Sequence, residues 1–258
     1  MLFGRLQRWI EAERARPPAP TRAWYWTLTL GIAVLLFGAS LTQIFPQDGA
    51  GIAAGYGAPV LAFEFAGGQG DLEAIFGVES DPQQVARLAA MRTGNERDYL
   101  YMLLYAGFLG CGCFALWREL RFRALLAATS LPVAAALSDA YENWLLFDIQ
   151  TAFTAGDYSP AMASLPYPVA AKFLLLAFTN AVIGAAAMQI GRWWALFGTL
   201  AILAAIPTVM AIITPAAFAW MLIPSAAAGW LLLLALAAAG SWRAFARGQP
   251  LVGGDMSR

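Results

Sequence analysis

Six stretches of about 20 apolar residues run through the chain and restrict its fold more than any other feature. They cover Trp24–Phe45, Asp98–Trp117, Ala124–Phe147, Pro168–Ile190, Trp193–Ile213 and Ala216–Gly240. Because lipid offers no hydrogen-bond partner to an exposed backbone, a spanning segment of this kind must be a helix. Charged residues make up only 12% of the 258, whereas a soluble domain carries about 25%. We therefore predict an all-α polytopic membrane bundle of about six transmembrane helices.

The arginines predict how this bundle is oriented. Twelve of the 15 fall in the N-terminal segment, in alternate connections and in the C-terminal tail, and three fall in the segment after the first span. Because cytoplasmic segments carry the excess of Lys and Arg, both termini are expected in the cytoplasm of a bacterial inner membrane. The expected organisation is a cytoplasmic interfacial helix at 1–22, a transmembrane domain at 23–242 with an outer cap at 46–97, and a cytoplasmic tail at 243–258.

Local patterns add detail at both ends of the bundle. Residues 1–16 have an apolar face opposite Arg and Glu, which predicts a helix lying on the membrane surface, with a frayed tail as the alternative. The apolar, Gly-rich residues 49–70 are expected to lie against the membrane or to re-enter the bundle. Two short cap helices are expected to follow, at 71–76 and from a capping box at Asp81 to about Met91, ending at Gly94. Pro207 and Pro224 are expected to kink the last two spans, either as ordinary membrane prolines or to open a cavity.

Composition excludes several chemistries. The chain has no histidine, so a histidine base and histidine-ligated zinc or haem are not possible, and the cofactor stays unknown. Cys111 and Cys113 point about 200° apart on a helix, which favours packing over a metal or redox pair. No metal site is predicted. The expected partners are the lipid bilayer and a small-molecule or lipid ligand, and a net charge of +0 gives no indication of nucleic-acid binding.

Lys172 is the only lysine of the chain, and it lies just inside an apolar stretch. A charge at membrane depth is costly and marks function more often than a surface charge does. Helical spacing gives three spans a polar face each. The candidate ligand- or ion-binding residues on these faces and in the cap are Glu64, Asp98, Tyr101, Tyr105, Asp139, Glu142, Asn143, Lys172 and Asn180.

Depth along the helices brings these charges together in the outer half of the bundle. Lys172 is expected to reach Glu142 and Asp139 across an antiparallel helix pair. These two carboxylates and one ammonium leave one negative charge, which a proton, a bound cation or Arg97 from the cap could neutralise. A structural ion-pair network, proton or cation chemistry and binding of a lipid headgroup all stay open.

The order of these motifs resembles a family of bacterial multi-pass membrane proteins. The resemblance rests on four motifs between Glu64 and Lys172. They are Phe-Glu-Phe-Ala at 63–66, Asp-Tyr-Leu-Tyr-Met-Leu-Leu-Tyr at 98–105, Asp-Ala-Tyr-Glu-Asn at 139–143, and Lys-Phe at 172–173. The resemblance supports a polar site at these positions and implies no activity.

Three functions are compatible with such a site. Binding or transport of a small polar, ionic or lipid-headgroup ligand, balanced by a proton or cation, is weakly favoured. A membrane-embedded enzyme could use Asp139 or Glu142 as acid or base on a lipid or isoprenoid, with Lys172 holding an anion. An accessory subunit of a membrane complex could use the ion pairs to fix helix register.

Overall fold

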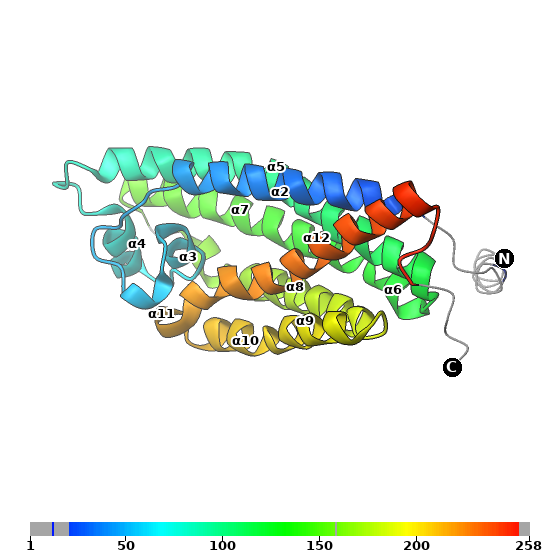
Figure 1. Cartoon of the computed structure of the whole chain (residues 1–258). Helices are drawn as coiled ribbons and strands as arrows, with labels where there is room; N and C mark the ends of the chain where they lie inside the picture. The colour runs from blue at the N-terminus through cyan, green and yellow to red at the C-terminus, as the bar shows by residue number, and fades with distance from the viewer. Residues whose placement is uncertain (1–11, 13–20, 158, 253–258) are drawn as a thin grey trace, which may run out of the picture.

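The structure is a computed structural model that describes residues 12, 21–157 and 159–252, and in this part of the chain it contains helices and no strand. Six helical segments within it are long and apolar enough to cross a membrane, which confirms the predicted fold class. The long helices run along the same direction, and short helices cover one end of the bundle (Figure 1). We call this the capped end, and we call the end that holds α6 (Arg123–Ala128) the opposite end. The predicted helix over residues 1–16 lies outside the described residues.

The spans follow in chain order. The first four are α2 (Ala23–Ile44), α5 (Gln84–Leu120), α6 with α7 (Leu131–Ala155), and α8 (Pro166–Ala187). The fifth consists of α9 (Arg192–Leu203) and α10 (Ala205–Ile213), and the sixth of α11 (Pro215–Phe218), η3 (Ala219–Met221) and α12 (Leu222–Arg247). The cap contains η1 (Ala54–Tyr56), α3 (Pro59–Glu64) and α4 (Gln69–Phe76), and η2 (Pro160–Ala163) precedes α8.

Helix α5 differs from its prediction. The expected end of a cap helix at Gly94 is wrong, because one helix of 37 residues runs from Gln84 through this glycine to Leu120. A helix of this length extends about 55 Å, so it projects beyond a hydrocarbon core of about 30 Å. A side chain at Gly94 would place its Cβ 2.3 Å from Cε1 of Phe45. Tertiary packing against this ring therefore overrides the weak helix propensity of glycine.

The predicted third span is also longer and is interrupted. It was expected over Ala124–Phe147, whereas α6 ends at Ala128 and α7 begins at Leu131, with Pro132 in its first turn. Proline is tolerated there because the first helical N–H groups have no intrahelical partner. Helix α7 then continues eight residues beyond Phe147 to Ala155, and Phe153 packs into the cap. The end of α7 thus belongs to the capped end of the molecule.

Proline interrupts the fifth span where the sequence predicts a kink. Helix α9 ends at Leu203, four residues before Pro207, and α10 begins at Ala205. The break follows from the missing N–H of Pro207, which would have bonded to the carbonyl of Leu203. Pro224 lies in the first turn of α12 instead. A water-sized cavity of about 10 Å³ lies nearby, between α8, α10 and α12, and Asn180, Thr208 and Ser225 are among its lining residues.

The cap is held by its own apolar core. Phe63 of α3 and Phe76 of α4 pack edge to face, with ring centroids 5.1 Å apart, and both belong to a cluster with the end of α7 and the start of α8. Gly55 of η1 lies directly against α11, where a Cβ would come within 2.0 Å of the Ala216 carbonyl oxygen. Residues 49–70 therefore fold over the end of the helices and pack against them.

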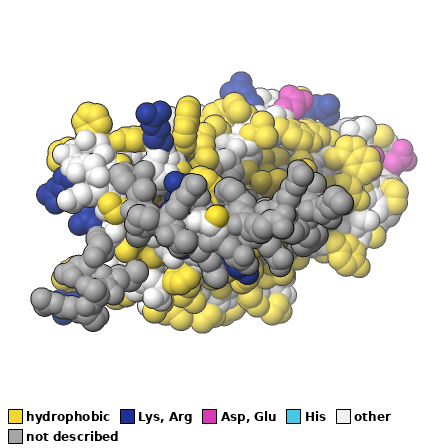
Figure 2. Space-filling view, turned by 90° about the vertical axis from the view of Figure 1, so that its right-hand side faces the viewer, with side chains coloured by type: hydrophobic (Ala, Val, Ile, Leu, Met, Phe, Trp, Pro, Cys, Tyr) yellow, Lys and Arg dark blue, Asp and Glu magenta, His cyan; other side chains and the backbone are white. Residues whose placement is uncertain are grey.

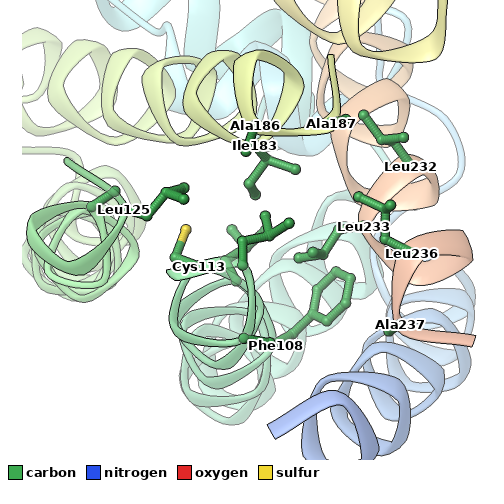
Figure 3. Packing of buried hydrophobic residues seen from close by; sticks show 14 of the residues in the cluster. Phe108, Cys113, Leu125, Ile183, Ala186, Ala187, Leu232, Leu233, Leu236 and Ala237 are labelled. Carbon is green, nitrogen blue, oxygen red and sulfur yellow. The ribbon is translucent and has the colours of Figure 1, made fainter. Parts of the chain in front are cut away.

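A larger apolar core fills the rest of the bundle. Figure 3 shows Phe108 and Cys113 of α5 facing Leu125 of α6, Ile183 of α8 and Leu233 of α12. Cys113 is buried in this core, Cys111 is partly buried, and both are free thiols. The packing interpretation of the two cysteines agrees with these positions.

A buried carboxylate holds the C-terminal segment 248–252 at the opposite end. Glu119 of α5 accepts hydrogen bonds from Trp24 Nε1 at 3.0 Å and from the backbone N–H groups of Leu251 and Val252 at 3.0 and 3.1 Å. Arg243 of α12 donates to the carbonyl of Leu251 as well. Viewed from this end, the surface carries several arginine side chains and few Asp or Glu (Figure 2).

Candidate functional site

Lys172 and three carboxylates form a buried cluster where α7 and α8 meet the cap. The Lys172 Nζ lies 2.8 Å from Glu142 Oε1, 3.2 Å from Asp139 Oδ1 and 3.2 Å from Glu64 Oε2. We call these four residues the lysine cluster. Asp139 and Glu142 come from one face of α7, Lys172 comes from the second turn of α8, and Glu64 is the last residue of α3. The cluster therefore joins two spans to the cap.

Helical spacing explains how two of the carboxylates reach the same nitrogen. Asp139 and Glu142 are three residues apart, so their side chains lie one turn apart on one face of α7. Lys172 faces them because α7 and α8 pack side by side. The predicted contacts of Lys172 with Glu142 and Asp139 are thus present in the structure. Glu64 was included in the candidate site, and its direct contact with Lys172 completes the set.

Polar groups of α5 and α7 surround the cluster. The Tyr105 hydroxyl donates to Asp139 Oδ2 at 2.9 Å, so this carboxylate has a partner on each oxygen. Asn143 Nδ2 donates to Asp98 Oδ2 at 3.2 Å and to the carbonyl of Asn95 at 3.1 Å. Asp98 is therefore linked to α7 next to the cluster, without an ion pair to Lys172.

Burial of the cluster is nearly complete. Lys172 is 5% exposed, Asp139 5% and Glu142 0%, and the Glu64 side chain is 12% exposed. One oxygen of Glu142, Oε2, is buried without a hydrogen-bond partner among the described residues. Isolated charges in such surroundings are costly, which makes the balance of charge in the cluster its main physical property.

The alternative in which Arg97 neutralises the surplus charge is not seen. Arg97 is exposed on α5, and the lysine cluster contains no arginine among the described residues. The ion pairs of the other two cap-end arginines lie elsewhere. Arg87 pairs with Asp81 at 2.7 Å, and Arg92 pairs with Glu96 at 3.2 Å.

The candidate residue Tyr101 lies beside the cluster. Tyr101 stacks on Phe37 and packs against Tyr105 and Trp230, with ring centroids 5.8–6.5 Å apart. No hydrogen bond of its hydroxyl to a cluster carboxylate is found. It forms part of an aromatic layer that covers the Tyr105 side of the cluster.

Asn180 lies farther away, on a different part of α8. It is eight residues beyond Lys172, which corresponds to about 12 Å along the helix and a rotation of about 80°. Its Nδ2 donates to the carbonyl of Ala226 on α12 at 3.2 Å, and its Oδ1 is buried without a partner beside the water-sized cavity. Lys172 and Asn180 therefore belong to two separate polar sites.

Two aromatic residues at the cluster were not among the predicted site residues. The Lys172 ammonium lies 4.6 Å from the ring centroid of Phe173, within the range of a cation–π interaction. Trp230 of α12 packs on Tyr105 at 5.8 Å, and its buried Nε1 has no hydrogen-bond partner among the described residues. A Lys-Phe pair at the start of a span is a weak sequence signal, and nothing around Trp230 points to Tyr105.

Burial raises the pKa of the Glu64 carboxyl above its ordinary value of 4.5, although Lys172 opposes this shift. Folding therefore favours the protonated form of Glu64. Its contribution to stability is complete below pH 4.5 and is lost as the pH rises through the raised pKa. We expect the melting temperature of the wild type to fall with rising pH more steeply than that of Glu64→Gln. The measurement is made in detergent, from below pH 4.5 to above the raised pKa of Glu64. An identical slope in both proteins would mean that folding does not raise the pKa of Glu64.

Comparisons with known proteins do not narrow the possible functions. No family model, no curated protein and no solved structure matches the chain. Among the described residues, no group of three or more His, Cys, Asp or Glu is arranged to hold a metal ion. The function has to be argued from the geometry of the lysine cluster.

Proposed function

We propose that this integral membrane protein binds protons at the lysine cluster and uses them to drive transport of a small polar or ionic solute. The observation that carries the proposal is the contact of one buried ammonium with three carboxylates, all within 3.2 Å. If all four groups were ionised, the cluster would have a net charge of −2. The question is whether the third carboxylate is stable as an anion.

A simple Coulomb estimate supports its protonation. Attraction to an ammonium at 3.2 Å is worth about 5 kcal/mol at an effective dielectric constant of 20. Two oxygens that lie within 3.2 Å of the same nitrogen are at most about 6 Å apart, where each repulsion costs about 3 kcal/mol. Repulsion from the two other carboxylates thus cancels the attraction to Lys172. The desolvation penalty of several kcal/mol then has no compensation, so the third group takes up a proton.

A proton suits this place better than a metal ion does. The Lys172 ammonium already lies at the point where the three carboxylates meet, and a metal ion there would be repelled by it. A proton needs no additional space and can bind to the unpartnered Oε2 of Glu142. The cluster therefore combines a fixed internal cation with exchangeable protons.

The position of Glu64 supports a link between protonation and movement. It is the only group of the lysine cluster that comes from the cap, at the end of the short helix α3. Because burial raises the pKa of Glu64, its protonation favours the closed position of the cap. Loss of this proton would leave a surplus buried charge, and the cap would then separate from the bundle more easily, which would open the site to a solute.

The proposal includes the orientation that the arginines predict. With the arginine-rich opposite end in the cytoplasm of a bacterial inner membrane, the capped end and the lysine cluster face the outer side. Protons would then enter the cluster from the outer side, beneath the cap.

Proton flux into liposomes tests the transport function. Purified protein in liposomes is subjected to a potassium diffusion potential, and a trapped pH dye reports proton entry. We expect wild type to carry protons faster than protein-free liposomes, Glu142→Gln to lose most of this flux, and Arg92→Gln to keep it. Arg92→Gln is the matched control, because it removes one member of an exposed ion pair at the same end. Flux no faster than in protein-free liposomes would contradict transport.

A structural role of the cluster is the second candidate. The three ion pairs of Lys172 connect α3, α7 and α8, which is what a device that fixes helix register requires. Glu142→Gln separates the two functions, because glutamine keeps the size of the side chain but binds no exchangeable proton. The transport proposal expects a folded protein without flux, whereas the structural role expects a loss of stability, since one ion pair of Lys172 is removed. No observation favours the lipid-modifying enzyme.

A further inference from the structure

The opposite end of the bundle contains a second site, distinct from the lysine cluster. A cavity of about 420 Å³ lies between the α8–α9 turn and the end of α12. Its lining includes Ile190, Trp194, Trp242, Arg243, Arg247 and Leu251. The volume falls within the range of small-molecule sites, which is about 300–1,000 Å³.

The charge of this cavity is uniformly positive. Among the described residues, two arginines line it and no acidic side chain does. Arg247 makes no ion pair within the described part of the chain, and it is exposed in the last turn of α12. Guanidinium groups present a planar set of donors that matches a phosphate group, and Arg is therefore the usual residue for phosphate recognition.

Arg243 is oriented by the chain itself. Its Nη1 donates to the carbonyls of Pro250 and Leu251, and Leu251 is in turn held by Glu119. A guanidinium has five N–H donors, so fixing Nη1 leaves donors for a ligand. The segment 248–252 thus positions one arginine and also forms a wall of the cavity.

The place of the cavity indicates its occupant. It lies where two apolar spans end, at Ala187 and Arg247, and where the next one begins at Arg192. Trp194 and Trp242 have indole rings that suit the membrane–water boundary, since they are apolar with one polar group. A ligand there would meet cations at one level and apolar helix surface below it.

We infer that this cavity binds the phosphate headgroup of an anionic phospholipid, with the acyl chains along the surface of α9 and α12. Basic pockets between membrane helices bind anionic headgroups by the same combination of charge and depth. The inference does not depend on the proposed transport function, because it uses none of the residues of the lysine cluster.

Native mass spectrometry of the full chain tests this inference. The detergent-purified protein is titrated with phosphatidylglycerol, with phosphatidylcholine and with inorganic phosphate. We expect phosphatidylglycerol to bind at least about tenfold more tightly than phosphatidylcholine, and Arg247→Gln to weaken its binding about tenfold. Arg192→Gln is the matched control, since it removes an exposed arginine at the same end that does not line the cavity.

Three results would overturn the inference. Equal binding of both lipids would remove the role of headgroup charge. An equal loss of phosphatidylglycerol binding in Arg247→Gln and Arg192→Gln would indicate a general effect of surface charge. Displacement of phosphatidylglycerol by inorganic phosphate at comparable concentration would make this a site for a free anion. Because Arg247 makes no hydrogen bond or ion pair with the other described residues, its variant is expected to fold as wild type.

Discussion

Replacing Lys172 by Met is expected to lower the free energy of unfolding by about 3–5 kcal/mol at neutral pH. The substitution keeps a long apolar side chain and removes the only cation among the described residues that contacts Glu64, Asp139 and Glu142. Three buried carboxyl groups then have no counter-charge, and a buried charge without a partner is strongly destabilising. Denaturation in mixed detergent micelles, followed by circular dichroism, measures the loss.

The pH dependence of this variant distinguishes lost charge from lost packing. Protons can neutralise the carboxylates when Lys172 is absent, so the deficit should shrink as the pH is lowered. The double variant Lys172→Met/Glu142→Gln should be more stable than Lys172→Met alone, because it contains one buried anion fewer. Arg92→Gln, which breaks an exposed pair, should cost well under about 1 kcal/mol. A deficit that is independent of pH would contradict the charge balance proposed for the cluster.

Replacing Glu119 by Ala is expected to lower the free energy of unfolding by about 3 kcal/mol and to release the segment 248–252. Three donors lose their acceptor, namely Trp24 Nε1 and the backbone N–H groups of Leu251 and Val252. Each buried donor left without a partner costs about 1–3 kcal/mol, and the three losses are not independent. Denaturation measures the stability, and limited proteolysis at the C-terminus measures the release.

Two further variants make the Glu119 result specific. Glu119→Gln keeps one acceptor oxygen, so it should lose less stability and release the segment only in part. Glu96→Ala is a matched substitution on the same helix at an exposed position, where only the surface pair with Arg92 is lost. If Glu119→Ala were cut by protease no faster than Glu96→Ala, Glu119 would not be what holds the segment.

The sequence was sufficient to predict the spans and the centre of the lysine cluster. Apolar length defines a membrane helix, and helical periodicity places Asp139 and Glu142 on one face. Lys172 faces them because consecutive spans pack antiparallel. These inferences need only local spacing and the order of the helices.

Features that depend on contacts between distant segments could not be predicted. The passage of α5 through Gly94 depends on the ring of Phe45, and the extension of α7 depends on the apolar core of the cap. Helical spacing places Asn180 on the same broad face of α8 as Lys172. Its position about 80° around the helix axis from Lys172 nevertheless directs it toward α12. The role of Glu119 requires a segment 132 residues farther along the chain.

Infrared spectroscopy of the carboxyl groups tests the central claim most directly. At neutral pH, wild type is expected to show the carbonyl stretch of a buried protonated carboxyl group, and this band should weaken in Glu142→Gln or Asp139→Asn. It should persist in Glu119→Gln, which changes a buried carboxylate outside the cluster. If every cluster carboxyl instead absorbed as a carboxylate at neutral pH, the cluster would hold no exchangeable proton, and the proposed function would be wrong.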